Sequence, residues 1–187
     1  MRIQPHPQPR TPEVRAASRA VAWTALAASL FLAGTYLAPW MEAAGHPAGR
    51  LVHWLYSPLC HQLPERSFEF FGAPLTVCAR CTGLYWGGWL GLVMAVGLVA
   101  RRRLQVRPVW LAFAAAPTVV DALLPWVGLT GLPSLPRFLL ALAPGLVAGL
   151  FLAAGVEDLV LVLMSRRERN ALWLRLRGAP VLEETDG

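Results

Sequence analysis

Four long apolar blocks dominate the pattern of hydrophobic and polar positions along the chain. They are Ala20–Trp40, Thr82–Ala100, Pro108–Leu129 and Phe138–Val156. A helix that rises about 1.5 Å per residue needs about 20 apolar residues to cross the hydrocarbon layer of a bilayer. The first, second and fourth blocks contain no charged residue, and the third contains only Asp121. The pattern therefore predicts an all-α integral membrane protein, a bundle of four transmembrane helices in contact with the lipid bilayer.

The segments outside these blocks divide the chain into a membrane domain and two tails. Residues 1–19 are rich in proline and carry little apolar pattern, so we expect a disordered tail there. Residues 20–164 form the predicted membrane domain, and residues 165–187 form a basic tail. The first apolar block is longer than the core of a cleaved signal peptide, which has about 7–15 residues, so we interpret it as the first span.

The basic side chains are all arginine, and their distribution predicts the orientation of the chain. Thirteen of the 17 precede the first block, lie between the second and third, or follow the fourth. Cytoplasmic loops carry the excess of basic residues, so we expect both termini on the cytoplasmic side of the cell membrane, that is, the inner or plasma membrane. The segment Met41–Cys81 then faces outward. Arginines at helix ends suit lipid headgroups, so we do not interpret the net charge of +6 as a nucleic-acid-binding surface.

All three cysteines lie in that outward-facing segment. Cys78 and Cys81 form a C-x-x-C at the start of the second span, and Cys60 and His61 lie upstream. Two thiolates at this spacing can bind one metal ion from a single tight turn. Cys60 and His61 would complete a tetrahedral set of ligands, which suits zinc or another transition metal.

Two considerations leave alternatives to this ligand set open. The adjacent side chains of Cys60 and His61 do not easily reach one ion, so His53 or His46 is an alternative nitrogen ligand. An outward-facing thiol cluster also lies in an oxidising compartment, where a redox-active disulfide competes with metal binding.

The stretch Tyr56–Gly87 resembles the signature of a prokaryotic membrane-protein family, domain of unknown function 2085. The family pattern is CHQxxxRSF followed by CxRCxGxYxG, and this chain has CHQLPERSF followed by CARCTGLYWG. The likeness is weaker downstream, where Pro117, Asp121 and Arg137 fit the family pattern but Ala122 stands in place of a glycine. The resemblance implies membership of a membrane-protein family and does not imply an activity.

Asp121 is the only ionisable side chain in the third block. A charge at that depth needs a partner or a water-filled cavity, so a structural ion pair and a proton or cation site are both open. In the predicted topology Asp121 lies towards the outer face, on the same side as Arg66, Arg80 and Arg137. We therefore predict that these four residues form one polar pocket between the helices, in which Asp121 pairs with Arg80 or Arg137.

The sequence leaves three functions open, and with them the question of whether the protein is an enzyme. The first is a membrane protein with a zinc site at its outer face, used for structure or for handling a ligand. The second is a thiol-disulfide oxidoreductase that passes electrons from the C-x-x-C to a quinone, although the chain lacks further cysteine pairs. The third is a small transporter that uses Asp121 and works as a homo-oligomer. No nucleotide-binding or hydrolase motif is present.

Overall fold

The computed structural model of the chain describes residues 11–99, 107–128 and 131–176. The helices are α1 (Thr11–Ala43), α2 (Ala48–Tyr56), α3 (Ala79–Val99), α4 (Pro108–Leu123) and α5 (Ser134–Leu176). The smaller elements are the 3-10 helices η1 (Pro64–Arg66) and η2 (Leu124–Val127) and the strands β1 (Glu69–Phe70) and β2 (Ala73–Pro74). The two strands pair as an antiparallel hairpin. The all-α class predicted from the sequence is confirmed.

Four of the described helices are long and apolar enough to cross a membrane. The candidate spans are Pro12–Ala43, Ala79–Leu98, Pro108–Val127 and Ser134–Arg167. Each overlaps one of the predicted apolar blocks, and the first and fourth extend well beyond theirs. The four-helix transmembrane architecture is therefore confirmed.

The predicted N-terminal tail differs from expectation where the structure describes it. Residues 11–19 belong to α1, because Pro12 is tolerated in the first turn of a helix and the alanines and arginines that follow are good helix formers. At the other end, α5 continues through the basic segment as far as Leu176. Residues 1–10 and 177–187, which make up the rest of the predicted tails, lie outside the described residues, as do the arginines at 101–103.

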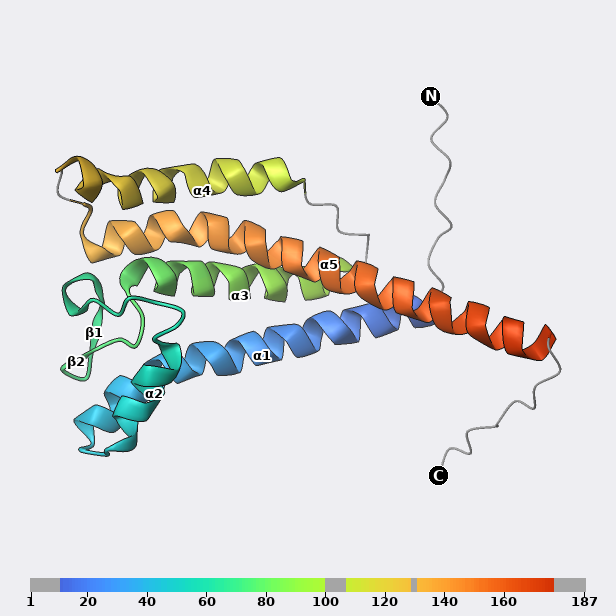
Figure 1. Cartoon of the computed structure of the whole chain (residues 1–187), viewed down its shortest axis with the longest axis horizontal. Coiled ribbons are helices and arrows are strands. Elements are labelled where there is room, and N and C mark those ends of the chain that lie inside the picture. The colour runs from blue at the N-terminus through green and yellow to red at the C-terminus, as the bar shows by residue number, and fades with distance from the viewer. Residues whose placement is uncertain (1–10, 100–106, 129–130, 177–187) are drawn as a thin grey trace.

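The helices pack side by side with α3 in the middle. Helix α3 lies between α1 and α5, and α4 packs along the other side of α5 (Figure 1). Helix α2 and the β-hairpin close one end of the bundle, next to the end of α1 and the start of α3 (Figure 1). We call this end, formed by residues 40–81, 124–128 and 131–137, the cysteine end.

Glycines let α3 and α5 approach until their backbones touch. The seam consists of Gly83, Gly87 and Gly91 on α3 and Gly145 and Gly149 on α5. A Cβ atom at Gly87 would overlap the Leu142 carbonyl oxygen, and one at Gly149 would overlap the Gly88 carbonyl oxygen. Without a hydrophobic driving force between helices in lipid, such close packing is a main source of helix association. The seam therefore fixes α3, which carries two of the three cysteines, against α5.

A proline in α1 provides an anchor for the segment that leads into α3. Pro39 has no N–H group, so the Thr35 carbonyl in α1 lacks its usual donor four residues further on. The Thr76 hydroxyl donates a hydrogen bond to that carbonyl at 2.7 Å, and both threonines are buried. The bond satisfies a backbone group that would otherwise be costly to leave unpaired inside a membrane. It also ties the chain to α1 two residues before Cys78.

Candidate metal centre and neighbouring ion pair

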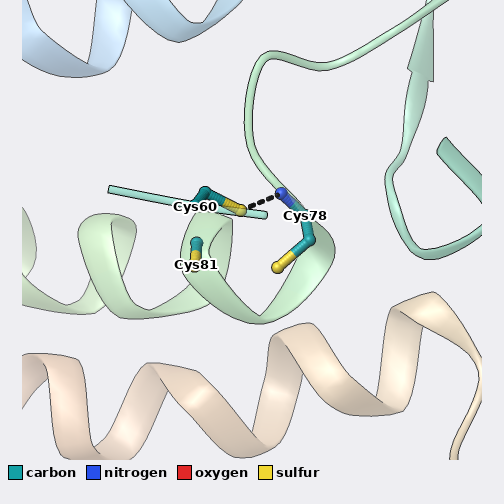
Figure 2. Close-up of side chains that lie close together, drawn as sticks. All are labelled: Cys60, Cys78 and Cys81. Carbon is teal, nitrogen blue, oxygen red and sulfur yellow. Dashed lines mark hydrogen bonds between the residues drawn. The ribbon is translucent and has the colours of Figure 1, made fainter. Parts of the chain in front are cut away.

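The three cysteines converge at the cysteine end of the bundle. Cys60 lies between α2 and η1, Cys78 immediately precedes α3, and Cys81 is in the first turn of α3 (Figure 2). Their three sulfur atoms lie within 4.8 Å of one another, and all three thiols are free. Three thiolates on one tetrahedral zinc ion lie about 3.8 Å apart, because each Zn–S bond is about 2.3 Å long. The observed group is close to that size.

The start of α3 brings Cys78 and Cys81 onto one face. Residues three apart on a helix are neighbours, so a C-x-x-C at a helix start places both sulfurs on the same side. The Thr82 N–H and hydroxyl both bond the Cys78 carbonyl, at 2.9 and 3.1 Å, which closes this first turn. A helix N-terminus carries a partial positive charge that stabilises thiolates.

Cys60 is oriented by backbone donors from both sides. The Cys78 N–H donates to the Cys60 Sγ at 3.2 Å, as Figure 2 shows, and the Gln62 N–H donates to the same sulfur at 3.4 Å. The Cys78 and Cys81 side chains, followed by these N–H groups, lower the pKa of the Cys60 thiol, although its burial opposes the shift. Donors aimed at a sulfur atom favour its ionised form, which is the form that binds a metal.

Gln62 holds the turn that carries Cys60. Its φ of 51° lies in the left-handed region, which a residue with a side chain adopts only when its surroundings require it. The Gln62 side-chain amide donates to the His53 carbonyl at 2.7 Å and to the Thr76 carbonyl at 2.9 Å. It therefore ties α2 and the segment before Cys78 to one turn. Gln62 was not among the predicted site residues, although it follows Cys60 and His61 in the motif.

An apolar shell surrounds the sulfur atoms. Tyr56 and Val77 are buried with Cys60, and Phe31 and Tyr85 pack against them. The Tyr56 hydroxyl donates to the Phe31 carbonyl at 2.7 Å, and burial raises the pKa of this phenol. The shell keeps Cys60 at 7% exposure and lowers the local dielectric constant, which strengthens interactions between the sulfurs and any cation.

The histidines predicted as nitrogen ligands lie outside the sulfur group. His61 is exposed, and no histidine nitrogen in the described part of the chain joins the three sulfurs within 4.8 Å. His46 is exposed too, and its Nδ1 accepts a hydrogen bond from the Ala48 N–H at 3.2 Å. His53 is half-buried on α2. The two adjacent residues differ in burial, because Cys60 is buried whereas His61 is exposed.

A second polar group lies at the same end of the bundle. Asp121 forms an ion pair with Arg80, and its Oδ2 lies 3.4 Å from the Arg137 Nε. The Asp121 Oδ1 accepts a hydrogen bond from the Leu132 N–H at 3.1 Å. Asp121 is 2% exposed, so the carboxylate does not face lipid. The structure does not bring Arg66, at the end of η1, into this group.

Helix α4, which carries Asp121, is fixed against α5 by a bond one turn earlier. Pro144 leaves the Leu140 carbonyl of α5 without its usual donor, and the Thr118 hydroxyl donates to it at 3.0 Å. This arrangement repeats the one between Thr76 and α1. It sets the position of Asp121 relative to Arg137 at the start of α5.

Arg80 links the two groups through the chain, because it lies between Cys78 and Cys81. The cysteines pack towards Tyr56 of α2, whereas the Arg80 side chain reaches Asp121 of α4. The two groups therefore use different neighbours of α3, although they share its first turn.

Comparisons with known proteins agree with the architecture. A family described as "Predicted membrane protein (DUF2085)" matches residues 60–154. An uncharacterized protein of Methanocaldococcus jannaschii is 31% identical over 107 residues, which is 54% of this chain and 69% of that protein. An uncharacterized protein of Methanothermobacter thermautotrophicus is 32% identical over 95 residues, or 51% of this chain and 81% of that protein. No solved structure matches the chain.

Proposed function

The chain belongs to the DUF2085 family of predicted membrane proteins, and we propose that this member binds one zinc ion through Cys60, Cys78 and Cys81. One observation carries the proposal: three free sulfurs within 4.8 Å of one another, with two backbone N–H groups aimed at one of them. Sulfur-rich sites of this size suit zinc, which is borderline-soft and accepts tetrahedral geometry. The fourth position is left for water or a small ligand, or for His61, whose exposed side chain would have to turn towards the sulfur atoms.

The same observation weighs against the alternative of a disulfide-generating enzyme. Such an enzyme relays oxidation through further cysteine pairs, and the whole chain has three cysteines, all in this one group. The transporter alternative, which rests on Asp121, is also not favoured. Two arginines contact this carboxylate, so an incoming cation would meet their positive charge.

The double variant Cys78→Ser, Cys81→Ser is expected to lose the metal ion, because it removes two of the three thiolates. Elemental analysis of wild-type protein purified without chelators should find about one equivalent of zinc per chain. His46→Ala changes an exposed histidine of the same segment and is the matched control, which should keep its metal. His61→Ala tests the fourth ligand, because a weaker zinc affinity would assign that position to His61.

Two results would contradict the zinc site. One is a metal content below about a tenth of an equivalent in the wild type, and the other is full metal in the double cysteine variant. A stoichiometric disulfide between Cys78 and Cys81, with bound quinone, would support the oxidoreductase in its place.

We also propose that the cysteine end faces away from the cytoplasm of a cell whose plasma or inner membrane holds the protein. The arginine distribution supports this orientation, because positive residues are retained on the cytoplasmic side. Reporter fusions after Ala100 and after Gly131 test it. The first fusion is expected to report a cytoplasmic location and the second an extracytoplasmic one. The reverse result would overturn the orientation and leave the zinc site unaffected.

A further inference from the structure

The ion pair around Asp121 contains more positive charge than negative charge. Arg80 and Arg137 supply two guanidinium groups, and Asp121 supplies one carboxylate. Arginine keeps its proton under all ordinary conditions, so the group carries an excess of one positive charge. Arg137 is 8% exposed, which leaves that excess charge in a largely buried place.

The carboxylate has little capacity left to satisfy the arginines. Its Oδ1 accepts from the Leu132 N–H, and its Oδ2 is shared between Arg80 and Arg137. Among the described residues, no acceptor forms a hydrogen bond with the buried Nε atom of either arginine, although the Asp121 Oδ2 lies 3.4 Å from the Arg137 Nε. A buried charge without enough partners is costly, and cations inside membrane proteins usually meet a counter-charge or water. The group therefore has more hydrogen-bond donors than acceptors.

Gly131 packs directly against the Arg137 guanidinium group. A Cβ atom at residue 131 would overlap the terminal Nη2 of Arg137 and would lie 3.6 Å from the Asp121 Oδ1. Arg80 is 26% exposed, so the group is accessible from its side. A small anion could therefore approach the two arginines from the side of Arg80.

We propose that Arg80 and Arg137 bind the phosphate group of an anion, with Asp121 holding both guanidinium groups in place. The planar guanidinium fork matches two oxygens of a phosphate group, which makes arginine the preferred residue for binding it. Bound phosphate would accept hydrogen bonds from guanidinium N–H groups that the single carboxylate leaves over, and it would balance the excess charge. The phosphate has two sources in a membrane protein, the headgroup of a phospholipid and free phosphate in solution. This proposal does not depend on the zinc site.

The test measures phosphate binding by the full chain in a detergent without phosphate, such as a maltoside. Inorganic phosphate and phosphatidylglycerol are titrated separately, with binding followed by calorimetry and by native mass spectrometry. Arg137→Gln and Arg80→Gln are each expected to weaken binding about tenfold or more, because each removes charged hydrogen bonds. Arg50→Gln, at an exposed arginine of α2, is the matched control and should bind like the wild type.

The outcomes separate the two sources of phosphate and can overturn the proposal. Binding of inorganic phosphate supports a free anion, and binding of the phospholipid alone supports a headgroup. Failure of the wild type to bind either ligand, or equal binding by wild type and Arg137→Gln, overturns the site. If Arg137→Gln does not fold, Arg137→Lys keeps the charge beside Asp121 and should still bind about tenfold more weakly, because it lacks the fork. Unchanged zinc content in the arginine variants would show that the metal site is intact.

Discussion

Gly87→Leu is expected to separate α3 from α5 and to destabilise the bundle strongly. The Gly87 Cα faces α5, and even a Cβ atom there would overlap the Leu142 carbonyl oxygen. Because backbone atoms cannot move aside as a flexible side chain can, the two helices must shift apart. Overpacking of this kind costs about 3 kcal/mol, and losing the close contacts along the seam adds to that cost.

The measurement is the midpoint of thermal unfolding in detergent, together with the yield of folded protein. Gly97→Leu is the matched control, because Gly97 is on the same helix and nothing lies within 4 Å of a Cβ atom there. We expect Gly97→Leu to unfold near the wild-type temperature and Gly87→Leu to unfold well below it. Equal midpoints for the two variants would show that the glycine seam does not hold α3 against α5.

Asp121→Asn is expected to destabilise the cysteine end by about 3 kcal/mol, because it leaves two arginines without a counter-charge in a buried place. The wild-type carboxylate is 2% exposed and contacts both guanidinium groups. Neutral asparagine fills the same space, so the effect isolates the charge from the packing. Asp158→Asn is the control on α5, because Asp158 is exposed.

A double-mutant cycle measures how strongly Asp121 and Arg137 stabilise one another. Removing Arg137 as well, in Asp121→Asn, Arg137→Gln, relieves part of the excess charge. The double variant should therefore be less destabilised than the sum of the two single variants, since contacting charges couple. Additive effects would mean that Asp121 and Arg137 do not stabilise one another.

The length and charge of the apolar blocks were enough to predict the membrane class. A run of about 20 apolar residues matches the thickness of the hydrocarbon layer of a bilayer, so four such runs predict four spans. The residues at which the helices begin and end were harder to predict from the sequence. Residues 11–19 looked irregular because of the neighbouring prolines, yet they continue α1, and α5 continues past Arg167 to Leu176. Helix ends depend on capping and on neighbouring helices, which an average over apolar residues does not record.

In the candidate metal site, too, local helix geometry sets some of the contacts and tertiary packing sets the others. The C-x-x-C spacing by itself places Cys78 and Cys81 on one face of α3, because neighbours on a helix are set by its local geometry. That Cys60 joins them while His61 does not depends on the left-handed turn at Gln62 and on its bonds to two carbonyls. Those bonds join segments far apart in the chain, and no local pattern contains them.

The contacts of Asp121 could be predicted only in part from the sequence. A single carboxylate in an apolar block requires a partner, and topology places Arg80 and Arg137 on its side of the membrane. Only the packing of α4 on α5 decides that both arginines contact it while Arg66 does not. The sequence alone thus determined which residues could meet, through span length and charge, because both act locally along the chain. The tertiary structure decided which of them do meet, because helix packing brings together side chains from separate spans.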